Sequence, residues 1–433
     1  MTNPSFATIL DTAAATPAPV LLQELRGQGR TRFEALGLPN RRQEAWRFTR
    51  LKDIEETEFS APPLVPSRID VTPWRRADAH ALVFIDGMFS PDFSEVDDLP
   101  DGVVVSNLML ATASDSEIVK KHLGSLTSLD DQPFAALNTA VLADGAVIHV
   151  PAGVEVESPI QLLFFAGKSD SPTVCAPRIL IVAGEASGVT IEEHHVGTEG
   201  SALSCPVSEI VVEAQAVVRH VIVQDETPTT QHLASRHVVM GQGSRYSAQA
   251  ISLGGALART DIQVDLAGED AEASLDGLYL TDGKQQADSH LTLRHKAPNC
   301  RSHQLYKGVL AGSSRAVFTG RIVVEQDAQK TDSTQSNRNL ILSDDAVANS
   351  NPQLEIFADD VRCTHGSTVG RLDDDAVFYL RSRGIGREEA RRLLTLAFAG
   401  EVLDRIPLEP LREELQQRVS ERLALMERSG DGA

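Results

Sequence analysis

The stretch from residue 134 to residue 370 consists of short apolar runs that recur at close and fairly even intervals, separated by Gly, Asp, Asn and Ser. Examples are IQLLFF, RILIVAG, EIVVEA and VVRHVIVQ, and no long helical pattern lies between them. Many short, evenly spaced strands without crossover helices indicate an all-β sandwich, barrel or solenoid. The region therefore predicts a mainly β core.

A drifting repeat favours the solenoid. A turn residue, then small residues, then an apolar run begin at Ala183, Val212, Gly241 and Ala267, so the spacing between them is nearly constant. A rung that cannot bury its apolar face alone stacks on the next rung and produces such a period. The register then slips, because the next similar turn is expected only at Ala311, after a much larger step. The open strand edges at the end of a solenoid are sites where a second solenoid can pair.

The N-terminal part, residues 1–133, predicts a helical or mixed region. Up to about residue 50 it reads as helical, with the stripe Leu21, Leu22, Leu25, Phe33 and Leu36, and ALVFIDG at 81–87 predicts a short strand. In RRQEAWRFTRL, Trp46 and Phe48 lie among arginines, which suggests a surface segment in which neighbouring basic side chains shield an aromatic ring.

The C-terminal part, residues 371–433, predicts helices. Asp373 and the two aspartates after it fit an N-cap and first turn, and Gly384 fits the end of that helix. Two amphipathic helices follow, one from about Arg387 and one from about Pro410. These helices pack on one another or form a cap outside the solenoid that offers a docking surface.

Charge and cysteine content limit the possible partners. The chain has 40 basic and 61 acidic residues, a formal net charge of −21 at pH 7, which disfavours nucleic acid and anionic membranes as ligands. Its four scattered cysteines form no disulfide framework and indicate a reducing compartment. With neither a signal-peptide pattern nor an apolar stretch of the roughly 18 residues that a membrane span requires, we expect a cytoplasmic protein.

The strand-like region ends in CTHGSTVG, in which Cys363 and His365 are separated by a single residue. Side chains at this spacing project from the same face of a strand, so the two can hold one metal ion together. Tetrahedral and cluster-type centres take about four ligands, so the pair is half a site, and the others come from elsewhere in the fold, from water or from a second chain. The alternative is that Cys363 packs as a small apolar side chain and His365 forms a local hydrogen bond.

Other histidines and cysteines favour structural roles. Adjacent His194 and His195 point to opposite faces of a strand and do not readily share an ion. One further group falls within a short stretch, but its spacing matches no common zinc pattern, so we expect a structural loop there and leave its function open: His290, His295, Cys300 and His303.

Three stretches carry a resemblance to a known family. They are RQEAWRFT, the run from RHKAPNCRS to NPQLEI, and CTHGSTVGRLDDDAVFYLRSRGI. Together they resemble the SufB/SufD family of iron-sulfur cluster assembly scaffold proteins, most of all its SufD branch. The resemblance implies a right-handed parallel β-helix core over 134–370, flanked by the helical regions 1–133 and 371–433.

The resemblance also implies a function. The chain would be a non-enzymatic scaffold subunit of the SUF (SufBCD) complex that pairs with a SufB-like paralogue through its β-helix and with a SufC-like ATPase through its C-terminal helices. His365, with Cys363 beside it, would contribute to a transient site for iron or an iron-sulfur cluster at the subunit interface. No cofactor would be tightly bound in the isolated chain, which could form a homodimer when alone.

Two other classes remain open from the residues themselves. One is a β-helix enzyme acting on polysaccharides, although aromatic residues are only 5% of the chain and no cluster of carboxylates stands out on one strand face. The other is a purely structural homodimer that holds no metal.

Overall fold

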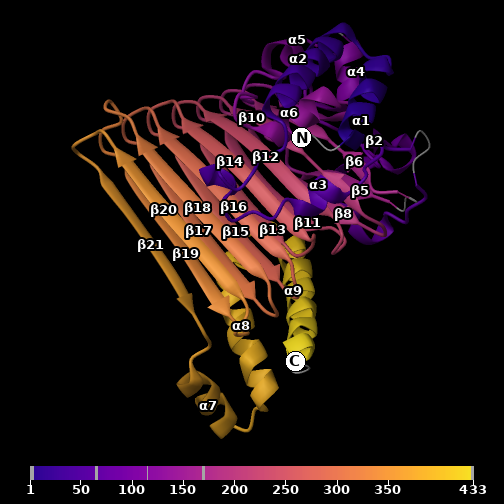
Figure 1. The fold of residues 1–433 in the computed structure, drawn as a ribbon. Coiled ribbons are helices and arrows are strands. Elements are labelled where there is room, and N and C mark those ends of the chain that lie inside the picture. Colours follow the sequence, from indigo (N-terminus) through magenta and orange to yellow (C-terminus); the bar gives the residue numbers. More distant parts are fainter. Residues whose placement is uncertain (1–3, 64–66, 115, 168–170, 431–433) are drawn as a thin grey trace.

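The computed structural model describes residues 4–63, 67–114, 116–167 and 171–430. Two long sheets lie face to face and form a parallel β-solenoid of about eight turns, with helices at both ends of the chain (Figure 1). The prediction of a mainly β solenoid with helical flanks is confirmed.

The strands alternate between the two sheets along the chain. The ten-stranded sheet has the order β2-β1-β5-β8-β11-β13-β15-β17-β19-β21, and the eleven-stranded sheet has the path β20-β18-β16-β14-β12-β10-β7-β4-β3, with β6 and β9 beside it. Neighbours are parallel, except that β2 and β3 run antiparallel to β1 and β4.

The strands of the ten-stranded sheet are β1 (His80–Ile85), β2 (Met88–Phe89), β5 (Ile160–Ala166), β8 (Gly188–Gly197), β11 (Val217–Asp225), β13 (Arg245–Ser252), β15 (Glu272–Thr281), β17 (Arg301–Leu310), β19 (Asp332–Ile341) and β21 (Arg362–Gly370). Those of the eleven-stranded sheet are β3 (Val104–Asn107), β4 (Gly145–Val150), β6 (Thr173–Cys175), β7 (Arg178–Ala183), β9 (Ala202–Ser204), β10 (Val207–Val212), β12 (Gln231–Met240), β14 (Leu257–Leu266), β16 (Gln286–His295), β18 (Arg315–Val324) and β20 (Val347–Ile356).

The α-helices of the described chain precede and follow the main run of strands, and short 3-10 helices span Glu44–Trp46, Thr72–Trp74 and Pro91–Phe93. The α-helices are α1 (Pro4–Ala15), α2 (Val20–Leu36), α3 (Lys52–Glu56), α4 (Leu108–Ala113), α5 (Glu117–His122), α6 (Pro133–Ala140), α7 (Asp374–Ser382), α8 (Arg387–Leu403) and α9 (Glu409–Gly430). Residue 134, where we expected the strands to begin, lies in α6, and the strand expected at 81–87 is β1, which belongs to the solenoid. No helix in the described ranges is both long enough and apolar enough to cross a membrane.

One corner of the solenoid explains the repeat. Residues with positive φ stack there at nearly equal intervals along the chain: Ala186, Gln215, Gly243, Asp270 and Asn299. The backbone N–H of each donates to a carbonyl of the next turn, for example Ala186 N–H to Ala214 O at 2.8 Å. A single left-handed residue per turn makes the sharp bend that links the two sheets.

The expected register slip is wrong. The turn after Asp270 is at Asn299, with no slip, and Ala311 belongs to a different corner, where the Ser313 N–H donates to Gly283 O at 2.8 Å. The solenoid has more than one kind of turn, and two different corners look alike in sequence because both are rich in Gly, Ser and Ala.

Aliphatic side chains fill the space between the sheets. Representatives from successive strands are Ile191, Ile210, Val218, Val238 and Ile262, all almost completely buried. Alternation along each strand places these residues inside and the intervening residues outside. The stacked aliphatic rungs therefore form one continuous core.

Small residues make room for the large interior rings. A Cβ at Gly277 would lie 2.3 Å from the Tyr306 ring, and one at Gly308 would lie 2.1 Å from the Tyr279 ring. Glycine at these two strand positions lets each tyrosine pack across its neighbouring rung. The interior becomes polar here, since the Tyr279 hydroxyl donates to Asn339 at 2.6 Å.

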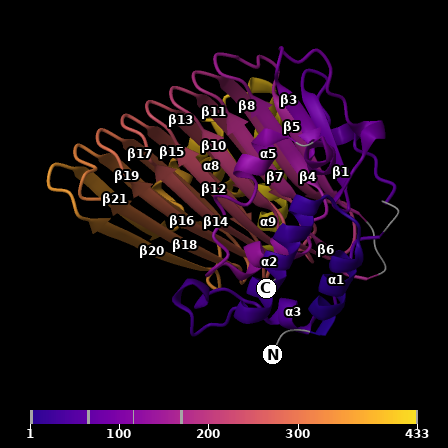
Figure 2. The ribbon, with the colours of Figure 1, turned by 90° about the horizontal axis from the view of Figure 1, so that it is seen from above.

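The helices cover the outer faces of the sheets. The N-terminal helices lie against the eleven-stranded sheet, where α2 packs beside α6, and α8 and α9 lie along the ten-stranded sheet (Figures 1 and 2). Leu411, Leu415 and Val419 of α9 share a buried cluster with Val221 and Leu278 of the sheet. The C-terminal helices therefore pack on the solenoid as well as on one another.

The two ends of the solenoid differ. At the N-terminal end, the short antiparallel strands β2 and β3 lie outermost in the two sheets. At the other end, β20 and β21 are the outermost strands, and no strand of the described chain pairs with their free edges (Figure 1). The C-terminal end presents unpaired backbone donors and acceptors.

Candidate functional site

Cys363 and His365 lie on the outermost strand, β21. Their register partners on β19 are Ser333 and Gln335, both of which are buried in the solenoid interior. The two side chains therefore lie on one face of β21, the face that lines the open end of the stack. His365 is exposed and Cys363 is half-buried.

The surroundings of Cys363 are partly apolar. It packs at the edge of a small cluster that contains Ile322, Val324 and Ala358. Burial raises the pKa of the thiol, and the charge of Asp332 adds to this effect. The thiol is protonated by default, so a metal that binds there must displace a proton.

Several apolar residues on and beside β20 and β21 are exposed at the C-terminal end of the solenoid. Val347 and Ile356 on β20, Phe357 just after it and Val369 on β21 are each between 39% and 63% exposed. Exposed apolar side chains beside free strand edges are typical of surfaces that pair with another chain.

α7 continues the chain away from β21. The Asp373 side chain accepts a hydrogen bond from the Asp375 N–H at 2.9 Å, so the predicted N-cap is confirmed. Phe378 and Tyr379 on this helix are 69% and 57% exposed. α7 therefore presents two largely exposed aromatic rings shortly beyond the strand that carries Cys363 and His365, and Arg383 lies over one of them, Tyr379.

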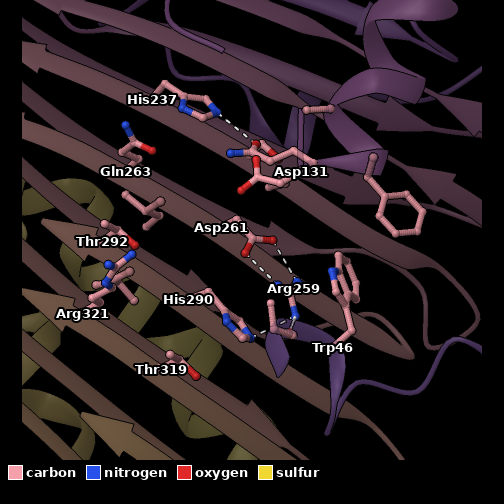
Figure 3. A pocket seen from close by; sticks show the side chains of 18 of the residues that line it. Trp46, Asp131, His237, Arg259, Asp261, Gln263, His290, Thr292, Thr319 and Arg321 are labelled. Carbon is pink, nitrogen blue, oxygen red and sulfur yellow. Dashed lines mark hydrogen bonds and ion pairs between the residues drawn. The ribbon is translucent and has the colours of Figure 1, made fainter. Parts of the chain in front are cut away.

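A groove of about 530 Å³ lies on the outer face of the eleven-stranded sheet (Figure 3). Trp46 forms one wall, and its ring stacks on the Arg259 guanidinium at 3.7 Å. Arg259 also donates two hydrogen bonds to Asp261, both at 2.8 Å, and lies 3.0 Å from His290.

The groove shows that the surroundings of Trp46 differ from those expected from the sequence. Trp46 is buried and stacks on an arginine from β14, so Trp46 is not a ring on a surface segment. The expected shielding by a neighbouring arginine is present at Phe48, because Arg47 lies over its ring. Burial lowers the pKa of His290 to about 3, and the Arg259 charge adds to this. The polar groups around Trp46 bind one another, which is typical of an anchor that fastens the N-terminal segment to the sheet.

A second polar group lies inside the solenoid. The Glu193 carboxylate on β8 is 2.8 Å from His195 Nε2, 3.1 Å from His220 Nε2 and 3.1 Å from Arg236 Nη2. All four side chains are almost completely buried. Burial alone would raise the pKa of Glu193, but Arg236 and the two imidazoles hold it well below its ordinary value.

Next to this group, three potential metal ligands converge. His195, Glu226 and His232, which we call the interior triad, each place one donor atom within 4.8 Å of the others. They come from the end of β8, the turn after β11 and the start of β12. No sequence pattern reveals this triad, because a full turn of the solenoid separates His195 from the other two along the chain, and only the stacking of rungs brings them together.

The other histidines singled out in the sequence lie in different parts of the structure. His194 and His195 are on opposite faces of β8, as expected: His195 joins the interior group, whereas His194 lies 3.7 Å from outward-facing Glu192. The remaining group is also divided, because His290 lies in the outer groove and His295 is inside the solenoid.

Cys300 is in the corner turn, and its thiol donates to the Gly268 carbonyl at 3.2 Å. His303 lies near Asp276 and Arg405, on the side covered by the C-terminal helices. The structural loop expected for this segment is present, and the four residues form no common site.

Comparisons with known proteins assign the class. Residues 164–398 match the model of the SUF system FeS cluster assembly SufBD core domain, and residues 10–162 match the SufBD protein N-terminal region. The class is therefore an iron-sulfur cluster assembly protein of the SUF system. The chain belongs to the SufB/SufD family.

Similar proteins from distant organisms support the same family assignment. The chain is 37% identical over 400 residues to an iron-sulfur cluster assembly SufBD family protein of Synechocystis, covering 89% of this chain and 88% of the relative. It is 31% identical over 419 residues to the chloroplastic protein ABCI7 of Arabidopsis thaliana, covering 94% and 88%. It is 30% identical over 392 residues to the iron-sulfur cluster assembly protein SufD of Escherichia coli, covering 89% and 90%.

Proposed function

We propose that this chain is a non-enzymatic scaffold subunit of a SufBCD-type complex, in which Cys363 and His365 supply part of the ligand set for iron or a nascent iron-sulfur cluster. The observation that carries the proposal is the position of the two side chains. They share one face of an outermost strand whose free edge is open to a second chain.

The donor types support iron or a cluster as the cargo. Thiolate sulfur and imidazole nitrogen are both ligands of iron-sulfur centres, and two donors leave about two positions for a partner. Because Cys363 is half-buried and His365 is exposed, a paralogous solenoid facing β21 can reach the same ion. Iron or the cluster is thus cargo held transiently between chains, in a cytoplasm that keeps the thiol reduced.

The paralogue would pair through the free edges of β20 and β21. These strands offer backbone hydrogen bonds, and the apolar residues beside them offer contact area. A second copy of this chain can use the same edges, so a homodimer is the competing assembly when the paralogue is absent.

A SufC-like ATPase would bind the C-terminal helices. α7 follows β21 directly and exposes Phe378 and Tyr379, and aromatic anchors are typical of protein interfaces. A movement of α7 on ATP hydrolysis would therefore act on the strand that carries Cys363 and His365 and open the interface to iron.

The test is anaerobic cluster reconstitution with the SufB-like and SufC-like partners. His365→Ala and Cys363→Ala should leave folding and complex formation intact but reduce cluster yield by at least about tenfold. Thr364→Ala is the matched control, since Thr364 is also exposed on β21 but points to the opposite face.

Unchanged cluster yield in both site variants would refute the ligand role. A chain that forms only homodimers and holds no iron with its partners present would instead support the purely structural alternative.

A further inference from the structure

The interior triad lies apart from the open end of the solenoid and has no part in the function proposed above. Its members are 2%, 5% and 3% exposed for His195, Glu226 and His232. Two imidazoles and a carboxylate are enclosed here beside the buried Glu193, His220 and Arg236. Buried polar groups are costly unless they are paired.

The triad is close to the dimensions of a metal site. A tetrahedral ion with bonds of about 2.1 Å separates its donor atoms by about 3.4 Å. The donor atoms of the triad lie within 4.8 Å of one another, and His232 Nδ1 is already 2.9 Å from a Glu226 oxygen. Small rotations of side chains would bring all three onto one ion.

His232 Nδ1 also lacks a satisfactory partner. Despite its short distance from Glu226, it is not aligned for a hydrogen bond, and it has no other hydrogen-bond partner in the described chain. A buried nitrogen left in this way costs free energy. A cation between the imidazole and the carboxylate would satisfy both groups.

A carboxylate contacts the imidazole of His195, as is common for histidines that bind metals. The His195 Nε2 is 2.8 Å from the Glu193 carboxylate, which is itself held by Arg236. The ring stacks on Phe164, with centroids 5.1 Å apart. A carboxylate that orients an imidazole from behind is the usual outer contact of a histidine ligand.

His232 also borders a small interior cavity. Gln224, Arg236 and Tyr279 line this cavity of about 40 Å³ together with His232, whereas His195 and Glu226 do not. Since one water needs about 10 to 15 Å³ of such volume, the cavity accommodates roughly three. Its polar lining can hydrogen-bond to them.

We propose that His195, Glu226 and His232 bind one first-row divalent cation of the Fe²⁺ or Zn²⁺ type inside the solenoid. Two histidines and one carboxylate with open positions are a donor set used for both ions. Because the site is sealed, the ion enters during folding or local opening and then exchanges slowly. The site is separate from Cys363 and His365 and does not depend on their role.

The experiment uses the full-length, untagged chain produced with added iron under anaerobic conditions or with added zinc. After incubation with EDTA and desalting, metal is measured by mass spectrometry. We expect about one ion per native chain, released when the chain is unfolded. Production with Co²⁺ should give visible d–d bands without a thiolate charge-transfer band.

Three sets of variants locate the ion. Glu226→Gln and His232→Ala should reduce the retained metal at least about tenfold. His295→Ala is the matched control, because His295 is also a buried interior histidine but contacts Ser302 instead of the triad. The double variant Cys363→Ala with His365→Ala should retain the ion, which separates this site from the proposed interface ligands.

Any of three results would overturn the proposal, and they concern the metal content, the Co²⁺ spectrum and the variants. One is a wild-type chain that retains less than about a tenth of an ion under both iron and zinc loading. Another is a Co²⁺ spectrum with thiolate bands. The third is metal that is lost with Cys363 and His365 but kept in the triad variants. Both wild-type measurements decide the matter even where a triad variant fails to fold.

Discussion

Trp46 and Arg259 are distant in the sequence, yet the Arg259 guanidinium lies 3.7 Å from the centroid of the Trp46 ring. This stack fastens the segment between α2 and α3 to the outer face of β14. The Trp46 ring also packs against Phe134, with centroids 5.5 Å apart, so one side chain joins α6 and the solenoid.

Trp46→Ala should lower the free energy of unfolding by about 3 kcal/mol, because it removes a buried aromatic ring and a cation–π contact. Phe48→Ala is the control: Phe48 is 43% exposed, so its loss should cost less than about 1 kcal/mol. Urea unfolding followed by circular dichroism measures both. Equal effects of the two substitutions would contradict the anchoring role of Trp46.

A buried ion pair should give the N-terminal region a pH-dependent attachment. Glu209 on β10 binds Arg178 at 2.8 Å and accepts hydrogen bonds from the N–H groups of Gly124, Leu126 and Thr127. Burial would raise the pKa of Glu209, but Arg178 and these N–H groups lower it below the ordinary value of 4.5.

A carboxylate with a lowered pKa stabilises the fold above its unfolded-state pKa, and this contribution is lost as the pH falls through the folded value. The wild type should therefore be more stable than Glu209→Gln at pH 7, and the difference should shrink below about pH 4.5. Unfolding of both proteins across this range tests the sign. A difference that grows on acidification would contradict it.

Cys363 should be the reactive cysteine of the folded chain. Burial raises the pKa of Cys175 to about 12 and also raises that of Cys205, and both thiols are enclosed, whereas Cys363 is half-buried at the open end. Iodoacetamide should label Cys363 at least about tenfold faster than the other three cysteines, as read by peptide mass spectrometry.

Labelling of Cys363 should also report on assembly. If the paralogue covers β21, complex formation should slow this labelling severalfold, and Cys363→Ala should give an almost unlabelled native chain. Equal rates with and without the partners would contradict an interface at β21.

The exposed aromatic rings of α7 should matter for ATPase binding. Phe378→Asp should weaken binding of a SufC-like ATPase about thirtyfold, the effect of losing an aromatic anchor of about 2 kcal/mol. The thermal midpoint should hardly change, because Phe378 is 69% exposed. Leu110→Asp on α4 is the control for an added charge at an exposed apolar residue, and isothermal calorimetry measures each affinity.

The sequence predicts the solenoid because each rung repeats one local pattern of turn and apolar run. The helix cap at Asp373 and the opposite faces of His194 and His195 are equally local, and the structure confirms them. Contacts between side chains of different rungs cannot be predicted from such local patterns. The Trp46–Arg259 stack and the interior triad depend on the register between turns, which changes slightly from one turn to the next even at a single corner.

The placement of Cys363 and His365 can be predicted from the sequence only in part. Their spacing predicts that they share a strand face, and β21 places them there. That this strand is the last of its sheet, with a free edge, depends on where the stack ends. No short sequence pattern carries that information.

The unequal ends of the solenoid set a limit on growth. Within the described chain, the long free edges belong to β20 and β21, because the outermost strands at the other end, β2 and β3, are only 2 and 4 residues long. An end-to-end pair through β20 and β21 would cover the long edges of both members and leave only the short ones for further growth. Association of this kind would therefore favour a discrete particle of two stacks over a fibre.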